Sequence, residues 1–270
     1  MAGHVITTIR TDGFEMDYLR FGHGDKAFVI LPGASVQSVI GSAEAICAAY
    51  SSMADDFTVF LFDRRKDVPE GYSLRSMASD TEKAMRAAGI EHANIFGASQ
   101  GGMIAMQIAA DAPELADKLV LGSTCACVNR QKYAFFEHLT KLAEDRKPPE
   151  LYRVLGEALF PKEVFDEMRD VFIDSSKSVT EDELDRFIIL TETMRDFDFT
   201  GDLGSIMCPV LVIGDTDDKV FGADSSEQIW KLLRSSADPE LYIYEGYGHS
   251  VYDLAPDYKE RMLRFLLRSA

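Results

Sequence analysis

The feature that most constrains the fold of this chain is the alternation of short apolar runs with segments of helical periodicity. Residues 27–31 are a continuous apolar run, which is typical of a strand covered on both faces, and residues 57–62 read as a buried strand. Strands that alternate with helices indicate a mostly parallel sheet wrapped on both sides. The sequence therefore predicts an α/β fold with a mostly parallel central sheet and helices on both faces. The apolar strands expected in that sheet are residues 27–31, 57–62, 93–96, 118–121, 210–213 and 241–244.

This rhythm stops between residues 129 and 205, where the pattern changes to several amphipathic helices broken by prolines. It resumes with the strand at 210–213. We therefore expect a core formed by residues 1–128 and 206–270, with residues 129–205 inserted as an all-helical lid. The lid should sit above the carboxyl ends of the strands and select an apolar acyl or ring group. The apolar side chains on which this expectation rests are Phe135, Phe136, Leu139, Phe172, Phe187 and Met194.

The charge, the cysteine content and the start of the chain limit the kinds of partner, site and location that we expect. The net charge of -17 argues against nucleic acid and anionic membranes as partners. The expected partner is a small-molecule substrate. The start of the chain has no secretory signal pattern, and no apolar run approaches the ~20 residues of a membrane span. The four cysteines form no C-x-x-C pair, and with the scattered histidines they predict no metal site in a cytoplasmic protein. The oligomeric state has no sequence signal.

The chemistry begins with the segment from Gly97 to Gly101, which reads G-x-S-x-G around Ser99 and lies between a predicted strand and a predicted helix. In that context the serine must occupy a turn so tight that the positions two residues away carry no side chain. The turn exposes the hydroxyl at a helix N-terminus, whose free N–H groups favour a developing negative charge. The pattern predicts that Ser99 is a nucleophile.

Two further segments supply the partners that a serine nucleophile needs. Asp215, Asp217 and Asp218 directly follow the strand at 210–213, where a carboxylate can orient an imidazole. His249 follows the last predicted strand in a glycine-rich loop, so it can reach Ser99 and serve as its base. The residue pattern alone leaves the choice among the three acids open.

In this order of serine, acid and histidine, the chain resembles the α/β-hydrolase superfamily from Val29 to Leu266. Relatives typically carry the acid in a G-x-x-D register, and Gly214 to Asp217 fits it, so the resemblance implies Asp217. It also implies an oxyanion hole made by the backbone N–H groups of Ala34 and Gln100, and it implies no cofactor. The family usually has His-Gly in the oxyanion loop, whereas this chain has proline at position 32.

The expected activity is hydrolysis of a small ester, lactone or thioester through an acyl-enzyme on Ser99. The same scaffold also resembles carbon–carbon bond hydrolases, perhydrolases and lyases, which use the same residues. A non-catalytic ligand-binding protein on this fold is the alternative from another class. A serine at position 99 argues against haloalkane dehalogenases, whose relatives have aspartate there. The substrate itself is not specified by the sequence.

Overall fold

A computed structural model describes residues 3–11, 13–233 and 239–268. These residues form an eight-stranded sheet in the order β1-β2-β4-β3-β5-β6-β7-β8. The expected mostly parallel sheet is confirmed, because neighbouring strands from β4 to β8 along this order are parallel, and the antiparallel pairs are β1 with β2 and β2 with β4. The strands are β1 (Val5–Thr11), β2 (Phe14–Gly22), β3 (Lys26–Leu31), β4 (Phe57–Arg65), β5 (Ala93–Ala98), β6 (Ala116–Gly122), β7 (Val210–Asp215) and β8 (Glu240–Tyr244).

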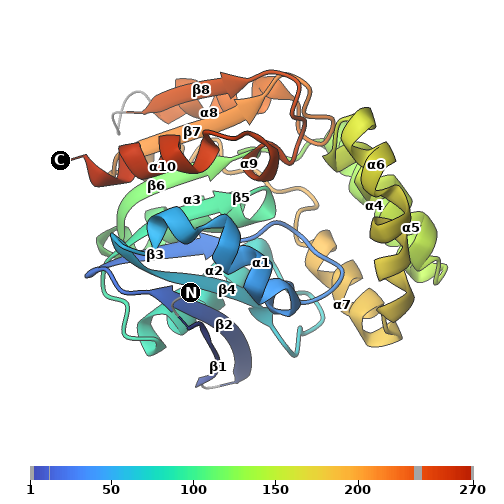
Figure 1. Ribbon diagram of the computed structural model, residues 1–270, viewed down its shortest axis with the longest axis horizontal. Coiled ribbons are helices and arrows are strands. Elements are labelled where there is room, and N and C mark those ends of the chain that lie inside the picture. Colours follow the sequence, from blue (N-terminus) through green and yellow to red (C-terminus); the bar gives the residue numbers. More distant parts are fainter. Residues whose placement is uncertain (1–2, 12, 234–238, 269–270) are drawn as a thin grey trace.

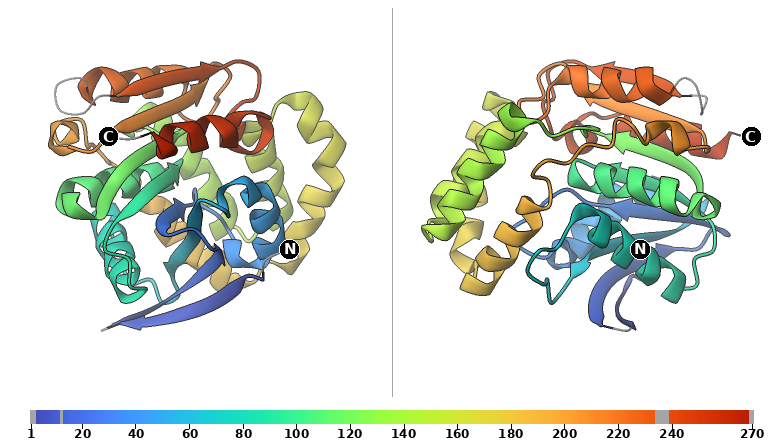
Figure 2. Two further views of the ribbon diagram at one scale, coloured as in Figure 1. Left: turned by 60° about the vertical axis from the view of Figure 1, so that its left-hand side comes forward. Right: turned by 180° about the vertical axis from the view of Figure 1, so that it is seen from behind.

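Helices cover both faces of the sheet. Figure 1 shows α1 and α10 in front of the sheet, and the rear view in Figure 2 shows α2, α3 and α8 on the opposite face. Each face has its own apolar core, and the central strands contribute to both because their side chains alternate between the faces. These helices are α1 (Ala43–Ala49), α2 (Leu74–Ala87), α3 (Gln100–Asp111), α8 (Ala223–Leu233), α9 (Val251–Leu254) and α10 (Tyr258–Leu267).

The stretch between β6 and β7 is helical, as its amphipathic pattern predicts. Figure 1 shows its four helices grouped together beside one end of the sheet. The helices are α4 (Arg130–Glu144), α5 (Pro148–Leu159), α6 (Lys162–Ser175) and α7 (Glu181–Glu192). Thr180 and Glu183 form a capping box that fixes the start of α7. That these helices act as a lid stays a prediction.

One predicted helix is broken in the structure. The pattern at 40–51 indicates a single helix, but the chain forms the 3₁₀ turn η1 (Val39–Ser42), then α1, then η2 (Ser51–Met53). Ser42 leaves helical geometry with a ψ of 23°, and Gly41 beside it has low helix propensity. Three further 3₁₀ turns are η3 (Pro113–Leu115), η4 (Ser176–Ser178) and η5 (Leu203–Ser205). None of the described helices has the length and apolar character needed to span a membrane.

Candidate active site

Ser99 lies on a strained turn between β5 and α3. Its φ of 54° and ψ of -122° are unusual for a residue with a side chain. A Cβ at Gly97 would collide with the carbonyl oxygen of Gly101, and a Cβ at Gly101 would collide with that of Leu31. The two glycines of the motif are therefore required by backbone crowding around the serine, as the sequence pattern predicts.

Substitution of Gly101 by alanine should destabilise the protein by at least ~3 kcal/mol, because the carbonyl oxygen that its Cβ would meet belongs to the central strand β3 and cannot move aside. Equilibrium urea unfolding measures this change. Gly204→Ala is the matched control, since a Cβ there meets no atom within 4 Å. Equal losses of stability in the two variants would contradict the crowding argument.

His249 lies opposite the nucleophile in the loop that follows β8. The residue is 1% exposed, and it lines the same cavity as Ser99. The Nδ1 atom of His249 lies 3.0 Å from both carboxylate oxygens of Asp218. An acid bound to Nδ1 holds the imidazole so that Nε2 is left to accept a proton from a nucleophile.

The prediction that Asp217 is the partner of His249 is wrong, because Asp218 occupies that position. Asp217 turns away and accepts a hydrogen bond from the N–H of Gly246 at 2.9 Å. The buried Asp215 accepts three backbone N–H groups, those of Asp217, Tyr247 and Gly248, at 2.8–3.0 Å. These bonds tie the end of β7 to the histidine loop, and the resulting turn directs the third acid, not the second, at His249.

The surroundings of Asp218 favour its ionised form. Burial acts to raise the pKa of this carboxyl, but the charge and hydrogen bond of His249 and the N–H groups of Phe221 and Val220 outweigh it, so the pKa is lowered. Val220 and Phe221 donate to Oδ1 at 2.8 and 3.1 Å. A lowered carboxyl pKa stabilises the folded protein above the ordinary aspartate pKa, and that contribution is lost as the pH falls through the folded value.

The two expected oxyanion donors flank Ser99. Ala34 lines the cavity beside Ser99, and Gln100 is the first residue of α3. Neither backbone N–H donates to another residue within the described part of the chain. Gly33 lies so close that a Cβ there would stand 3.2 Å from the Cβ of Ser99. Ala34 and Gln100 stay a prediction as oxyanion donors.

A cavity of about 320 Å³ opens in front of Ser99 and His249. Its wall is mainly apolar and comes from β3, β4, β5, the loop after β3, η1, α1 and α9, with Leu159 as its one contributor from the described helices α4–α7. Asp253 adds a carboxylate to the lining, and the Nζ atom of Lys259 lies 3.8 Å from it. The apolar and aromatic part of the lining is Ile30, Ala34, Val39, Ile46, Tyr50, Leu61, Phe96, Ala98, Leu159 and Tyr252.

A second cavity, of about 600 Å³, lies between the oxyanion loop and helices α5 to α7. It shares Ala34 and Leu159 with the first cavity, so the two adjoin. Of the side chains on which the lid prediction rests, Phe172 lines this second cavity. Phe136, Leu139, Phe187 and Met194 are buried in the core instead. Amphipathic periodicity identifies an apolar face but not the surface that it covers.

Two residues near the nucleophile are not predicted by the sequence patterns. Thr124, just after β6, donates from its hydroxyl to the carbonyl oxygen of Ser99 at 2.7 Å. This bond anchors the backbone of the strained turn to the residues that follow β6. Arg64, at the end of β4, donates to the carbonyl oxygen of Pro32 at 2.6 Å. Both come from the carboxyl ends of strands that neighbour the site, which is the signal that could have found them.

Side chains that could bind a metal ion are dispersed over the described residues. Among residues 3–11, 13–233 and 239–268, no three histidine, cysteine, aspartate or glutamate side chains cluster as they would around a metal ion. Burial raises the pKa of the Cys125 thiol to about 12 and that of Cys208 to about 11, which keeps both as neutral thiols at ordinary pH.

Known proteins share this sequence pattern and this fold. A family model for the alpha/beta hydrolase fold matches residues 27–256. The protein named "Putative carbamate hydrolase RutD" from Stutzerimonas stutzeri (strain A1501) is 24% identical over 241 residues, covering 83% of this chain and 88% of that protein. The one of the same name from Agrobacterium fabrum is 25% identical over 236 residues, covering 84% and 89%.

Solved structures show the same architecture. MGS-M2, an alpha/beta hydrolase from a Medee basin deep-sea metagenome library, superposes with a TM-score of 0.86 at 20% identity over 98% of each chain. The enol-lactonase from Burkholderia xenovorans LB400 superposes with a TM-score of 0.83 at 17% identity, covering 97% of this chain and 100% of that one. The nucleophile turn, the sheet order and the family match together place the chain in the alpha/beta hydrolase family.

Proposed function

We propose that this protein is a serine hydrolase that cleaves a small ester, lactone or thioester through an acyl-enzyme on Ser99. One observation carries the proposal. Ser99, on its strained turn, and His249 line the same mainly apolar cavity, and the Nδ1 atom of His249 is hydrogen-bonded to Asp218. A cavity of about 320 Å³ lies at the lower end of the size range of ligand sites, which supports a small substrate.

In the proposed reaction His249 Nε2 removes the proton of Ser99, and the alkoxide attacks the carbonyl carbon of the substrate. The Ala34 and Gln100 N–H groups stabilise the resulting oxyanion. His249 then returns the proton to the leaving alcohol or thiol, which departs. Water, deprotonated by His249, then attacks the acyl-enzyme, and His249 gives that proton to the Ser99 oxygen as the acid is released. Asp218 stabilises the imidazolium in both halves of the reaction. The steps balance with water as the second substrate, so the mechanism needs no cofactor.

A carbamate is a second candidate substrate. The relatives named for carbamate hydrolysis match most of the chain, and a carbamate carbonyl presents the same electrophilic carbon to Ser99. Carbon–carbon bond hydrolysis, perhydrolysis, lyase chemistry and non-catalytic ligand binding remain the alternatives. Turnover of an ester or carbamate that is lost in the Ser99→Ala variant distinguishes hydrolysis from these alternatives.

The apolar cavity should set a chain-length preference. Each buried methylene is worth ~0.8 kcal/mol, so kcat/KM on p-nitrophenyl esters should rise over the first few acyl carbons and then fall when the cavity is full. Leu159→Trp should move the optimum to shorter chains, because Leu159 borders the cavity in front of Ser99. Leu155→Trp is the matched control, since Leu155 comes from the same helix but lines the second cavity alone.

Steady-state kinetics on esters of two to twelve acyl carbons measure this profile. An unchanged optimum in Leu159→Trp would show that the acyl chain does not occupy the first cavity. A shift in Leu155→Trp alone would place the chain in the second cavity, under α5 and α6.

A further inference from the structure

Arg64 is a buried cation that lies directly behind the predicted oxyanion hole. It is 4% exposed and lies near the end of β4. Its Nη2 atom donates to the carbonyl oxygen of Pro32 at 2.6 Å and lies 3.4 Å from the side-chain oxygen of Gln100. Pro32 precedes Ala34 by two residues in the oxyanion loop. One nitrogen of Arg64 therefore touches both segments that carry the expected oxyanion donors.

The Gln100 side chain is fixed at its other end as well. It is 0% exposed, and its Nε2 atom donates to the carbonyl oxygen of Leu190 at 2.7 Å and to the hydroxyl of Thr193 at 3.2 Å. Leu190 lies in the last turn of α7, and Thr193 is the C-cap residue of that helix. The side chain of the residue that carries one expected donor thus spans from Arg64 to the helical insertion.

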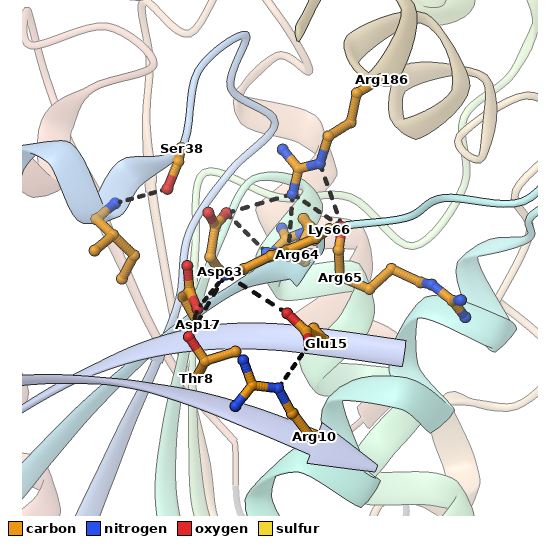
Figure 3. A network of polar contacts seen from close by, with 11 residues as sticks. Thr8, Arg10, Glu15, Asp17, Ser38, Asp63, Arg64, Arg65, Lys66 and Arg186 are labelled. Carbon is orange, nitrogen blue, oxygen red and sulfur yellow. Dashed lines mark hydrogen bonds and ion pairs between the residues drawn. The ribbon is translucent and has the colours of Figure 1, made fainter. Parts of the chain in front are cut away.

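A second arginine, from α7, holds the backbone around Arg64. The Nη2 atom of Arg186 donates to the carbonyl oxygens of Arg64 and Arg65 at 3.0 and 3.2 Å, and it lies 3.8 Å from the carboxylate of Asp63. Figure 3 shows Arg186 extending from its helix to the end of β4, with Asp63 and Arg64 beneath it. The end of β4 is thereby fixed from the side of the helical insertion.

The placement of Arg64 is costly for stability. Burial lowers the pKa of Arg64 to about 10, so the group still carries a full charge at neutral pH. Within the described part of the chain, its Nε and Nη1 atoms have no hydrogen-bond partner. Buried ionic groups are frequently replaceable by apolar residues without loss of stability. A function other than stability therefore accounts better for a charged side chain at this position.

We propose that Arg64 is a positioning residue that holds the Ala34 and Gln100 N–H groups at the spacing that an oxyanion requires. The proposal rests on the proposed hydrolase function. Proline at position 32 has no N–H and no polar side chain, so its carbonyl oxygen is the one polar atom through which this residue can be held. The planar guanidinium of Arg64 donates to that oxygen and to the side-chain oxygen of Gln100.

The test compares Arg64→Met with the matched control Arg65→Met on an ester that the wild type hydrolyses. Arg65 neighbours Arg64 but points away, to Asp80 and to the carbonyl oxygen of Gly13. Arg64→Met should lower kcat by ~10²-fold or more, the scale of losing one oxyanion donor, with KM changed less than about threefold. Arg65→Met should change kcat by less than about threefold, because it removes no contact to either donor segment.

A second readout separates positioning from general damage to the fold. A trifluoromethyl ketone forms a charged adduct with an active serine, whereas the matched methyl ketone binds without that charge. Arg64→Met should weaken binding of the trifluoromethyl ketone by a factor similar to the loss in kcat. The affinity for the methyl ketone should stay almost unchanged. A structural defect alone would weaken the binding of both ketones by the same factor. If Arg64→Met does not fold, Arg64→Lys decides, since lysine cannot form the planar contact to both acceptors and should lose about tenfold or more in kcat.

The outcomes distinguish the two proposals. A wild type that hydrolyses no ester and whose Ser99 takes up no fluorophosphonate refutes the proposed function itself. A wild type that is active, with Arg64 variants as active as Arg65→Met, overturns the role of Arg64 alone. Equal weakening of the two ketones in an Arg64 variant also overturns it, because positioning of the oxyanion donors must act on the charged adduct.

Discussion

Replacement of Ser99 by alanine is expected to lower kcat by ~10⁶-fold, the scale measured for loss of the nucleophile in a well-studied serine protease. The loss follows because no other group can form the acyl-enzyme. Intact-mass spectrometry after treatment with a fluorophosphonate should show one adduct on the wild type and none on Ser99→Ala. The cavity in front of Ser99 gives such a probe a place to bind.

The chain offers a matched control for this experiment. Ser123 is a buried serine at the end of the neighbouring strand β6, and like Ser99 it has a positive φ, of 43°. It does not line the cavity that contains His249. Ser123→Ala should keep both the adduct and the turnover. An adduct that persists on Ser99→Ala, or a wild type that takes up no probe, would contradict the assignment of the nucleophile.

The second large effect is expected at Asp218. Asp218→Asn should lower kcat by ~10⁴-fold, as loss of the orienting acid does in a comparable triad. An amide at this position can present its NH₂ group to Nδ1 of His249, which favours the tautomer that leaves Nε2 unable to accept the serine proton. Steady-state kinetics on a good ester substrate, with melting temperatures measured alongside, separate this loss from unfolding.

The neighbouring acids serve as controls with different expected outcomes. Asp217→Asn should change kcat by less than about tenfold, because its carboxylate accepts hydrogen bonds from the Thr216 hydroxyl and the N–H of Gly246, and has none with His249. Asp215→Asn should chiefly lower the melting temperature, because its two oxygens accept three backbone N–H groups and an amide nitrogen cannot accept any of them. A fall in kcat in Asp217→Asn as large as that in Asp218→Asn would overturn the assignment of the acid.

Much of the fold follows from local pattern. Continuous apolar runs such as residues 27–31 are stable only when both faces of a strand are covered, so the alternation with helices leads directly to the parallel sheet. The turn at Ser99 is equally local, because the crowding that excludes side chains at Gly97 and Gly101 arises within a few residues of the serine and from the adjoining strand β3.

The identity of the acid could not be settled in this way. Three aspartates lie within the four residues from the last residue of β7, Asp215, to Asp218, and each has a carboxylate that can bind an imidazole. The register of relatives favours Asp217, but the direction of a side chain in a turn depends on backbone dihedrals that the spacing does not specify. In the structure, the N–H groups of the loop from Gly246 to Gly248 bind Asp215 and Asp217, which leaves Asp218 for His249.

By itself, then, the sequence determined the class of fold, the nucleophile turn and the helical character of residues 129–205, because these depend on periodicity and on steric limits among near neighbours. The tertiary structure alone decided which aspartate meets His249, which apolar side chains border the cavity, and that Arg64 lies behind Pro32 and Gln100. Each of these depends on how segments distant in the chain approach one another, and local pattern carries no information about that approach.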